Sequence, residues 1–313
     1  MGISLFDTHA DTAYEMLRQR HHLINEKLHI SLNYAKDYES YTQCMALWCD
    51  KELSDEDAYT RFFEMYSYLK AECERDGLSE LCCTNSDIER AHKNGRAAFL
   101  IAVEDARLLS NKIERLDTLY EYGLRLLTFQ WQGNTCIGGG FDTDTPLTDF
   151  GVKVAHRCAE LGIIADISHA CERTARDMIE IMAEHKMPVI ATHSNSYAIC
   201  AHKRNLTDAL FSLLCECGGI AGISLAPQHL SLDSTATSEN VFSHIEHYAE
   251  VGGIDKICLG CDFDGISSTP SDITDLRYLY RIAEVMLRHN YKEDDVKAVF
   301  SENARRFMRT NLR

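Results

Sequence analysis

The sequence predicts an α/β fold in which eight parallel strands alternate with helices and close into a (β/α)8, or TIM, barrel. Eight short apolar runs recur along the chain, and most are continuous rather than alternating, as expected of parallel strands covered on both faces. Longer amphipathic stretches separate these runs. Strand followed by helix, eight times over, favours a closed barrel over an open doubly wound sheet, and 313 residues suit one such barrel.

The elements follow from this pattern in chain order. The apolar runs place the strands at 3–7, 43–49, 97–103, 124–129, 162–167, 188–192, 219–225 and 256–261. Helical spacing predicts helices at 54–74, from about 86 onward, and at 111–122, 148–161, 171–186, 206–217, 238–251, 272–289 and 293–309. Ser86 or Asp87 is the expected cap of the second helix. No linker or repeat divides the chain, so we expect residues 1–313 to form one barrel domain with a C-terminal helix.

The composition argues against several classes of protein. A formal net charge of −16 is unsuited to a nucleic-acid-binding surface, which needs a basic patch. No run of eighteen apolar residues occurs, so we expect no transmembrane helix, and the early polar residue Asp7 argues against a signal peptide. The thirteen cysteines form no recognisable framework, which favours reduced thiols. We therefore expect a cytoplasmic protein with no membrane or nucleic-acid partner.

Residues that can bind a metal follow five of the eight expected strands. His9 and Asp11 end the first strand, two residues apart and so on one face. The third, fifth, sixth and eighth strands end at Glu104, at Asp166 and His169, at His193, and at Asp262. Each alone has an ordinary structural explanation, because a strand-end aspartate commonly caps the next helix. A barrel, however, brings all these ends to one mouth, where its chemistry sits.

This set of residues predicts a metal site with hydrolytic chemistry. Three histidines and two carboxylates are more ligands than one tetrahedral zinc needs. A carboxylate shared by two metals about 3.5–4 Å apart would use them all. Such a pair lowers the pKa of a bridging water toward neutrality and polarises a carbonyl oxygen. The alternative is a barrel that keeps its ligands but serves as a binding or scaffold protein.

Several motifs together resemble the membrane (renal) dipeptidase family, which are dinuclear zinc barrels of the wider amidohydrolase group. The motifs are Asp7-Thr8-His9-Ala10-Asp11, Val103-Glu104, 161–169, 193–197, Lys203-Arg204-Asn205-Leu206 and 260–265. They cover nearly the whole chain, in order. The resemblance implies two zinc ions per chain, with His9 and Asp11 on one, His169 and His193 on the other, and Glu104 bridging them.

The resemblance also assigns the residues that handle the substrate. Arg204 matches the family arginine that holds the substrate's carboxylate, which its planar fork can bind bidentately. Asp262 matches the aspartate that moves the proton between the attacking water and the leaving amine. Asn205, beside Arg204 in the motif, is assigned to substrate binding. One departure stands out: Trp131 occupies the place of a family histidine that contacts the substrate carbonyl, and indole can only donate through its N–H. Gln132 or Asn134 would then be the replacement donor.

The resulting prediction is a zinc-dependent dipeptidase. A metal-bridging hydroxide attacks the scissile carbonyl, with Glu104 and Asp262 as the catalytic carboxylates and Trp131 at the substrate. The resemblance implies tolerance of D-residues at the C-terminal position, and a homodimer as an expected assembly. The alternatives are another barrel metallohydrolase, acting on N-acyl amino acids or lactones, and a catalytically impaired binding homologue that Trp131 would explain.

Overall fold

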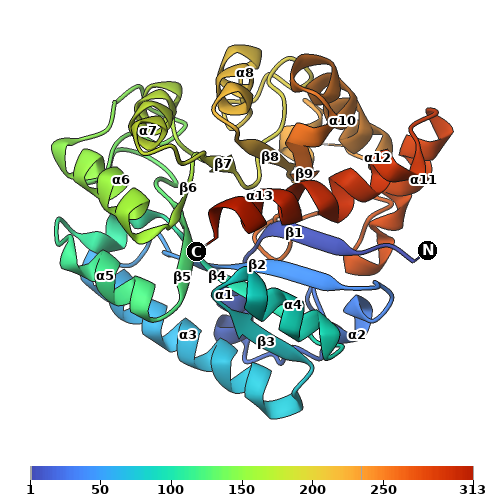
Figure 1. Ribbon diagram of the computed structural model, residues 1–313, viewed down its shortest axis with the longest axis horizontal. Coiled ribbons are helices and arrows are strands. Elements are labelled where there is room, and N and C mark those ends of the chain that lie inside the picture. The colour runs from blue at the N-terminus through green and yellow to red at the C-terminus, as the bar shows by residue number, and fades with distance from the viewer. Residues whose placement is uncertain (1, 234, 313) are drawn as a thin grey trace.

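The computed structural model describes residues 2–233 and 235–312, whose strands form one parallel sheet that closes on itself (Figure 1). The barrel runs β1, β2, β4, β5, β6, β7, β8, β9 and back to β1. Its strands are β1 Leu5–Ala10, β2 Tyr41–Trp48, β4 Ala97–Glu104, β5 Leu124–Thr128, β6 Ile164–Asp166, β7 Ile190–Ala191, β8 Ile220–Ile223 and β9 Ile257–Leu259. Each predicted apolar run overlaps one of these strands, which confirms the (β/α)8 barrel.

The sheet has one further strand, β3 (Ser79–Cys82), that the sequence does not predict. It pairs in parallel with the first half of β4, and β5 takes over the same edge of β4 from Ile101 onward. The segment has four residues and includes the charged Glu80, so it lacks the apolar run that marks the barrel strands.

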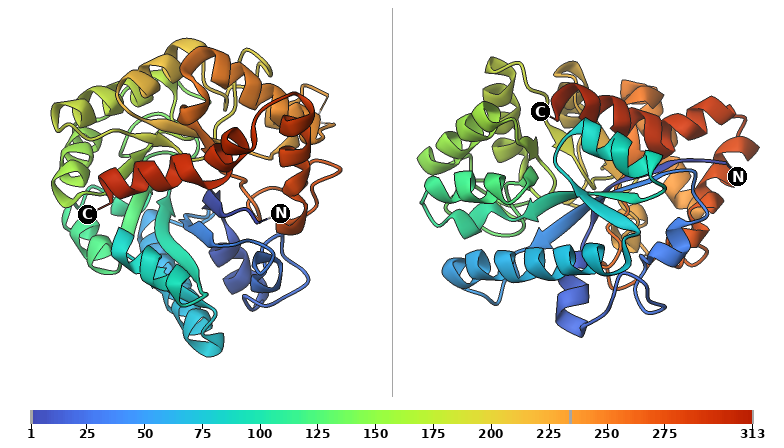
Figure 2. Two further views of the ribbon diagram at one scale, coloured as in Figure 1. Left: turned by 45° about the vertical axis from the view of Figure 1, so that its right-hand side comes forward. Right: turned by 60° about the horizontal axis from the view of Figure 1, so that its bottom comes forward.

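Helices surround the barrel and connect its strands (Figure 2). They are α1 Thr12–Gln19, α2 Leu32–Ala35, α3 Asp55–Asp76, α4 Asn85–Lys93, α5 Glu114–Glu121, α6 Asp149–Leu161, α7 Glu172–Glu184, α8 Asp208–Glu216, α9 Pro227–Leu230, α10 Ser238–Gly252, α11 Tyr280–Arg288, α12 Glu293–Lys297 and α13 Asn303–Asn311. Of these, α1, α2 and α9 are not predicted. The helix expected at 272–289 begins only at Tyr280, and the one at 293–309 is interrupted by a π-helical turn, Ala298–Glu302. In the described part of the chain, no helix combines the length and apolarity needed to span a membrane.

The start of α4 corrects one prediction. Its cap is Thr84 rather than Ser86 or Asp87, because Thr84 and Asp87 form a reciprocal capping box. The Thr84 hydroxyl accepts from the Asp87 N–H at 3.2 Å, and the Asp87 carboxylate accepts from the Thr84 N–H at 2.9 Å. Asp87 is thus part of the cap, but at its third helical position.

The barrel interior is apolar at one end and charged at the other. On β4, Ala98, Leu100 and Ala102 belong to one buried cluster inside the barrel, and Glu104 follows on the same face. The alternation of the strand therefore carries Glu104 to the carboxyl-terminal mouth. Functional side chains gather at this end of parallel barrels.

The opposite end of the barrel is covered by α13, which crosses the strands in Figure 1 (red) and in the left view of Figure 2. Phe307 and Met308 of this helix lie in the same buried cluster as Phe6, Ile164 and Ile220, near the starts of their strands. The expected C-terminal helix therefore closes the barrel by apolar packing, and the mouth is left as the end open to a substrate.

Candidate metal centre

The five predicted ligands converge at the mouth, around Glu104. On one side, His9 Nε2 lies 3.5 Å from Glu104 Oε2 and 3.4 Å from Asp11 Oδ2. On the other side, Glu104 Oε1 lies 2.8 Å from His169 Nε2 and 3.5 Å from His193 Nε2. One carboxylate oxygen of Glu104 thus lies near His9 and the other near His169 and His193, which is the arrangement that a bridging carboxylate requires.

The path of β1 explains how His9 reaches the site. Thr8 points into the barrel, where its hydroxyl donates to the carbonyl oxygen of Thr192 at 2.6 Å. Simple alternation would then turn His9 away. The pairing of β1 with β2 contains one extra residue between Asp7 and Ala10, a β-bulge that re-aims the side chain. As a result His9 stacks on His193 with ring centroids 3.7 Å apart.

Two site residues occupy an unusual backbone conformation. The backbone angle φ is 67° at His169 and 61° at Asp262. Both values lie in the left-handed region, which residues other than glycine rarely adopt. Each lies three residues after the end of its strand, β6 or β9. Strain of this kind persists where the surrounding structure enforces it, and it concentrates at functional sites.

The charges of the site are unbalanced without a cation. Burial, and then the charge of Glu104, raise the pKa of Asp11 to about 8. The pKa of Asp262 is raised to about 7, chiefly by burial. Burial opposes a charge on His9, but attraction to Glu104 and Asp11 outweighs it and raises the His9 pKa well above its usual value. Carboxylates buried close together in this way are stabilised by a bound cation.

The residues fit a divalent metal. His9 Nε2 and Asp11 Oδ1 are buried and have no hydrogen-bond partner, an arrangement that costs free energy unless another group satisfies them. Two groups of possible ligands come together, His9 with Glu104 and His193, and His9 with Asp11 and Asp262. Imidazole nitrogen and carboxylate oxygen are ligands that zinc accepts. These residues could therefore hold a metal pair.

A cavity of about 540 Å³ lies above these ligands. Its lining includes an aromatic wall in which Trp48 packs against Tyr14 and Trp131. Phe141 also lines the cavity, next to Arg204. Nitrogen donors and acceptors come from His202, Arg204, Gln228 and His229. The acidic floor includes Asp11, Glu104 and Asp262. A small zwitterion with an apolar side chain would find complementary groups on all three surfaces.

Arg204 is a buried cation without an anionic partner in the described residues. Its side chain lines the cavity, the residue is only 5% exposed, and burial lowers the pKa of its guanidinium. Nη2 donates to the carbonyl oxygen of His193 at 3.3 Å, whereas Nε has no hydrogen-bond partner. A buried, incompletely paired guanidinium facing a cavity is suited to bind a carboxylate of a ligand.

Trp131 lines the cavity as predicted, but Gln132 and Asn134, the predicted hydrogen-bond donors next to it, do not. Its ring lies 5.2 Å from Trp48 between centroids, and its carbonyl oxygen accepts from His169 Nδ1 at 3.1 Å. Gln132 and Asn134 are exposed and are absent from the cavity lining, which corrects their prediction as replacement donors. The loop turns both side chains out to solvent.

Asn205 does not reach this cavity either. Its amide donates to the carbonyl oxygens of Cys200 and His229, both at 2.8 Å, and so ties together two loops behind Arg204. It lines a smaller neighbouring cavity. The structure therefore places Asn205 as a support of the Arg204 loop, and its predicted substrate contact needs correction on this ground.

Residues after two strand ends also line the cavity, although the sequence does not predict them there. Trp48 is the last residue of β2, and Gln228 and His229 follow β8 by a few residues. The same rule that found the metal ligands, that chemistry follows the strand ends of a barrel, would have found them. However, Trp48 neither binds metals nor moves protons, and His229 lies four residues beyond the predicted strand at 219–225, so neither stands out in the sequence as a strand-end ligand.

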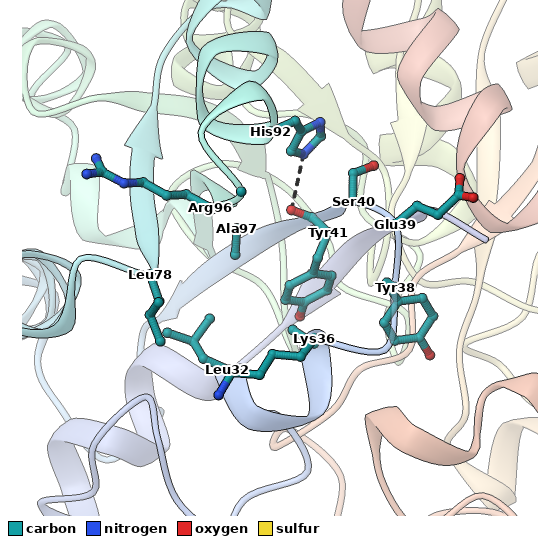
Figure 3. A pocket seen from close by; sticks show the side chains of 12 residues that line it. Leu32, Lys36, Tyr38, Glu39, Ser40, Tyr41, Leu78, His92, Arg96 and Ala97 are labelled. Atoms are coloured by element: carbon teal, nitrogen blue, oxygen red, sulfur yellow. Dashed lines mark hydrogen bonds between the residues drawn. The ribbon is translucent and has the colours of Figure 1, made fainter. Parts of the chain in front are cut away.

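A second cavity, of about 280 Å³, lies at the opposite end beside the starts of β2 and β4 (Figure 3). His92 faces it, and its Nε2 is hydrogen bonded with the carbonyl oxygen of Tyr41 at 3.2 Å. Arg96 extends away from it, toward Glu80 at 3.6 Å. Among residues 2–233 and 235–312, no group of three metal-ligating side chains converges there. Within the described residues, the groups of possible metal ligands therefore lie at the mouth.

Comparison with known proteins places this geometry in context. The sequence model of the membrane dipeptidase family, peptidase family M19, matches residues 2–312. Among solved structures, a dipeptidase described as an M19 metallo peptidase superposes with a TM-score of 0.92 at 24% identity, over 100% of this chain and 99% of the other.

Two further structures are similar. A metallo peptidase from Rhodobacter sphaeroides, liganded with a phosphinate mimic of the dipeptide L-Ala-D-Ala, has a TM-score of 0.92 at 23% identity over 100% of both chains. The probable dipeptidase PvdM from Pseudomonas aeruginosa has a TM-score of 0.86 at 15% identity, over 98% of this chain and 95% of the other. These likenesses confirm the barrel fold over the full length of the chain.

Proposed function

The chain belongs to the membrane dipeptidase family, peptidase family M19, and from this premise we propose that it hydrolyses dipeptides with two zinc ions held at the barrel mouth. The main support is the geometry of Glu104, whose Oε2 lies near His9, itself beside Asp11, and whose Oε1 lies near His169 and His193. Unpaired Arg204 in the same cavity supplies the second feature that a dipeptidase needs, a site for a free terminal carboxylate.

The residues divide the work as follows. Arg204 binds the C-terminal carboxylate and so fixes the scissile bond over Glu104. Asp262 lines the cavity, with Oδ1 3.9 Å from His9 Nε2, and is placed to carry the proton from water to the leaving amine. The aromatic wall of Trp48 and Trp131 packs against the substrate and excludes water. When bound, the zinc pair lowers the pKa of water and polarises the scissile carbonyl.

A substitute for the family histidine is present elsewhere in the cavity. His202 Nδ1 accepts from the Arg204 N–H at 3.2 Å, which leaves its Nε2 to carry the ring proton as a donor. His229 lies beside it, with ring centroids 4.7 Å apart. We assign to this pair the contact with the substrate carbonyl that the family histidine makes, and Trp131 keeps a packing role.

The test is a metal and substrate assay on the purified protein. We expect close to two zinc ions per chain, hydrolysis of a subset of dipeptides, and loss of activity on chelation with recovery on adding zinc. The panel includes dipeptides with D-residues at the C-terminal position, because most peptidases reject them and the family resemblance implies that this one accepts them. Background metal content, with unchanged stability in chelator, would rule out the proposal.

The panel also contains N-acyl amino acids and lactones. Their hydrolysis, without turnover of any dipeptide, would favour the alternative metallohydrolase. Metal binding without any turnover would instead favour the binding homologue. The cytoplasmic location and the homodimer stay predictions from the sequence; cell fractionation and sedimentation of the native protein test them.

A further inference from the structure

Asp166 is a fully buried carboxylate that the proposed chemistry does not use. It ends β6, and each of its oxygens accepts two hydrogen bonds. Oδ1 accepts from the backbone N–H groups of Ser168 and Thr192, both at 2.9 Å. Oδ2 accepts from the hydroxyls of Thr128 and Thr192, both at 2.6 Å. Ser168 and Thr192 directly precede the two histidines on one side of Glu104, so Asp166 holds the chain just ahead of both.

The Thr192 hydroxyl connects Asp166 to His193. Its single proton is donated to Asp166, and its oxygen lies 2.8 Å from His193 Nδ1. Toward the imidazole it can therefore only accept, so Nδ1 must carry the ring proton. The lone pair of His193 is thereby placed on Nε2, the nitrogen that faces Glu104.

The same reasoning applies to His169 by a different route. Its Nδ1 lies 3.1 Å from the carbonyl oxygen of Trp131, which can only accept, so its proton also sits on Nδ1. The two Nε2 atoms face each other at 2.9 Å with no proton between them. Two facing lone pairs repel, and a cation bound by both removes that repulsion.

Thr192 is fixed in place from its other side as well. Its carbonyl oxygen accepts from the Thr8 hydroxyl at 2.6 Å, inside the barrel. A Cβ at Gly222 would lie 2.0 Å from that oxygen and a Cβ at Gly260 1.7 Å, so only glycine allows this close approach. The orientation of Thr192 is thus built into the barrel and does not depend on a mobile loop.

We propose that Asp166, acting through the hydroxyl of Thr192, is the positioning residue that holds His193 in its Nδ1-protonated tautomer for metal binding. The inference rests on the proposed two-metal site. Partners that orient a metal-binding imidazole commonly change metal affinity by about 10- to 100-fold. Here the Thr192 hydroxyl lies between the Asp166 carboxylate and the His193 imidazole, whereas more usually the carboxylate accepts directly from the imidazole N–H.

Thr192 and Thr128 provide a matched pair of variants. Both hydroxyls donate to Asp166 Oδ2 at the same distance, but only Thr192 contacts a histidine. We expect Thr192→Val to weaken binding of one zinc by about 10- to 100-fold, measured by competition with a chromophoric chelator. Thr128→Val should change it less than about threefold, and Thr192→Ser, which keeps the hydroxyl, should retain the wild-type affinity. Equal losses in the two valine variants would show a merely structural role and overturn the proposal.

A second measurement needs no metal. In the metal-free protein, ¹⁵N spectra of labelled histidine should show His193 protonated on Nδ1 in the wild type and in Thr192→Ser, and on Nε2 in Thr192→Val. Wild-type protein with His193 protonated on Nε2 would refute the positioning role of Asp166 and Thr192. A wild type that binds no zinc would refute the proposed function, and the tautomer of His193 would still test the positioning role. Two bound zinc ions, with unchanged zinc affinity in Thr192→Val, would refute the positioning role alone.

Discussion

At the mouth of the barrel, buried carboxylates and histidines crowd together with unsatisfied atoms and strained backbone. At the other end, α13 covers the same strands with Phe307 and Met308, and the neighbouring side chains are apolar. The mouth is arranged at a cost in stability, because polar groups are buried there without full partners. The covered end offsets this cost by burying apolar surface. In this barrel the polar groups suited to chemistry lie at the mouth, and the apolar packing that stabilises the fold lies at the end covered by α13.

The largest expected effect compares the same substitution, glutamate to glutamine, at the two ends of the barrel. Glu104→Gln removes the charge that faces both ligand sets, so dipeptide turnover should fall by about 10³-fold or more, about 4 kcal/mol, while the fold survives. The matched control is Glu80→Gln, on β3 at the other end, where the carboxylate pairs with the exposed Arg90. Steady-state kinetics and circular dichroism check both. Normal turnover in Glu104→Gln would show that this glutamate does not bridge metals.

The next effect tests the covered end. Phe307→Ala should lower the free energy of unfolding by about 3–5 kcal/mol, because a large buried side chain is lost from the barrel plug. Turnover per folded molecule should stay within about twofold of the wild type. Exposed Arg309 on the same helix serves as control, with Arg309→Ala expected within about 0.5 kcal/mol. If Phe307→Ala altered the kinetics and left stability intact, the division between the ends would be wrong.

A smaller effect concerns how the mouth holds its substrate. Arg204→Met should lower kcat/KM for dipeptides by about 10²-fold, since a charged hydrogen bond to the terminal carboxylate is lost. Zinc content should not change. Lys203→Met, at the exposed neighbour, should leave kcat/KM within about twofold. Substrates with an amidated C-terminus should lose the difference between wild type and Arg204→Met, and a difference that persists would place the carboxylate elsewhere.

The smallest effect is a pH dependence of stability at the mouth. His244 accepts from the Ser196 N–H at 3.0 Å and supports the loop that leads to Arg204. Burial lowers the pKa of His244 to about 4, against about 6.5 when unfolded. The folded state therefore holds it neutral, and its stabilising contribution, complete above pH 6.5, is lost as the pH falls toward 4. Between pH 6.5 and 5 this loss is about 2 kcal/mol.

Denaturant unfolding at a series of pH values tests this. His244→Gln keeps an acceptor and a donor but cannot take up the proton, so its stability should fall less steeply over this range. His21→Gln, at the surface, should follow the wild type. An identical slope in His244→Gln and wild type would assign the acid sensitivity to other groups.

The sequence predicts the barrel and its ligands for the same physical reason. Strands covered on both faces must be apolar throughout, and charged residues directly after them stand out, as at Glu104 and Asp262. β3 is not predicted because the strand has only four residues and includes the charged Glu80, so it shows no apolar run. The bulge that re-aims His9 is not predicted either, because an extra residue in one strand shows only when the partner's register is known. His202, Arg204 and Asn205 lie close together in the sequence, and only the packing of two loops decides which of them reaches the cavity.

The junction of β1 and β9 gives the site one more property. Asp7 pairs with Leu259 across this seam, and the barrel cannot close before both strands exist and meet. His9 and Asp262 sit on either side of the same seam, 3.9 Å apart in space although far apart along the chain. Contacts so distant in sequence form slowly during folding, because a long loop must close first. A metal bound by residues of both strands would stabilise the pairing of β1 with β9. Because the site exists only after this pairing, metal binding would indicate when a newly made chain has closed its barrel.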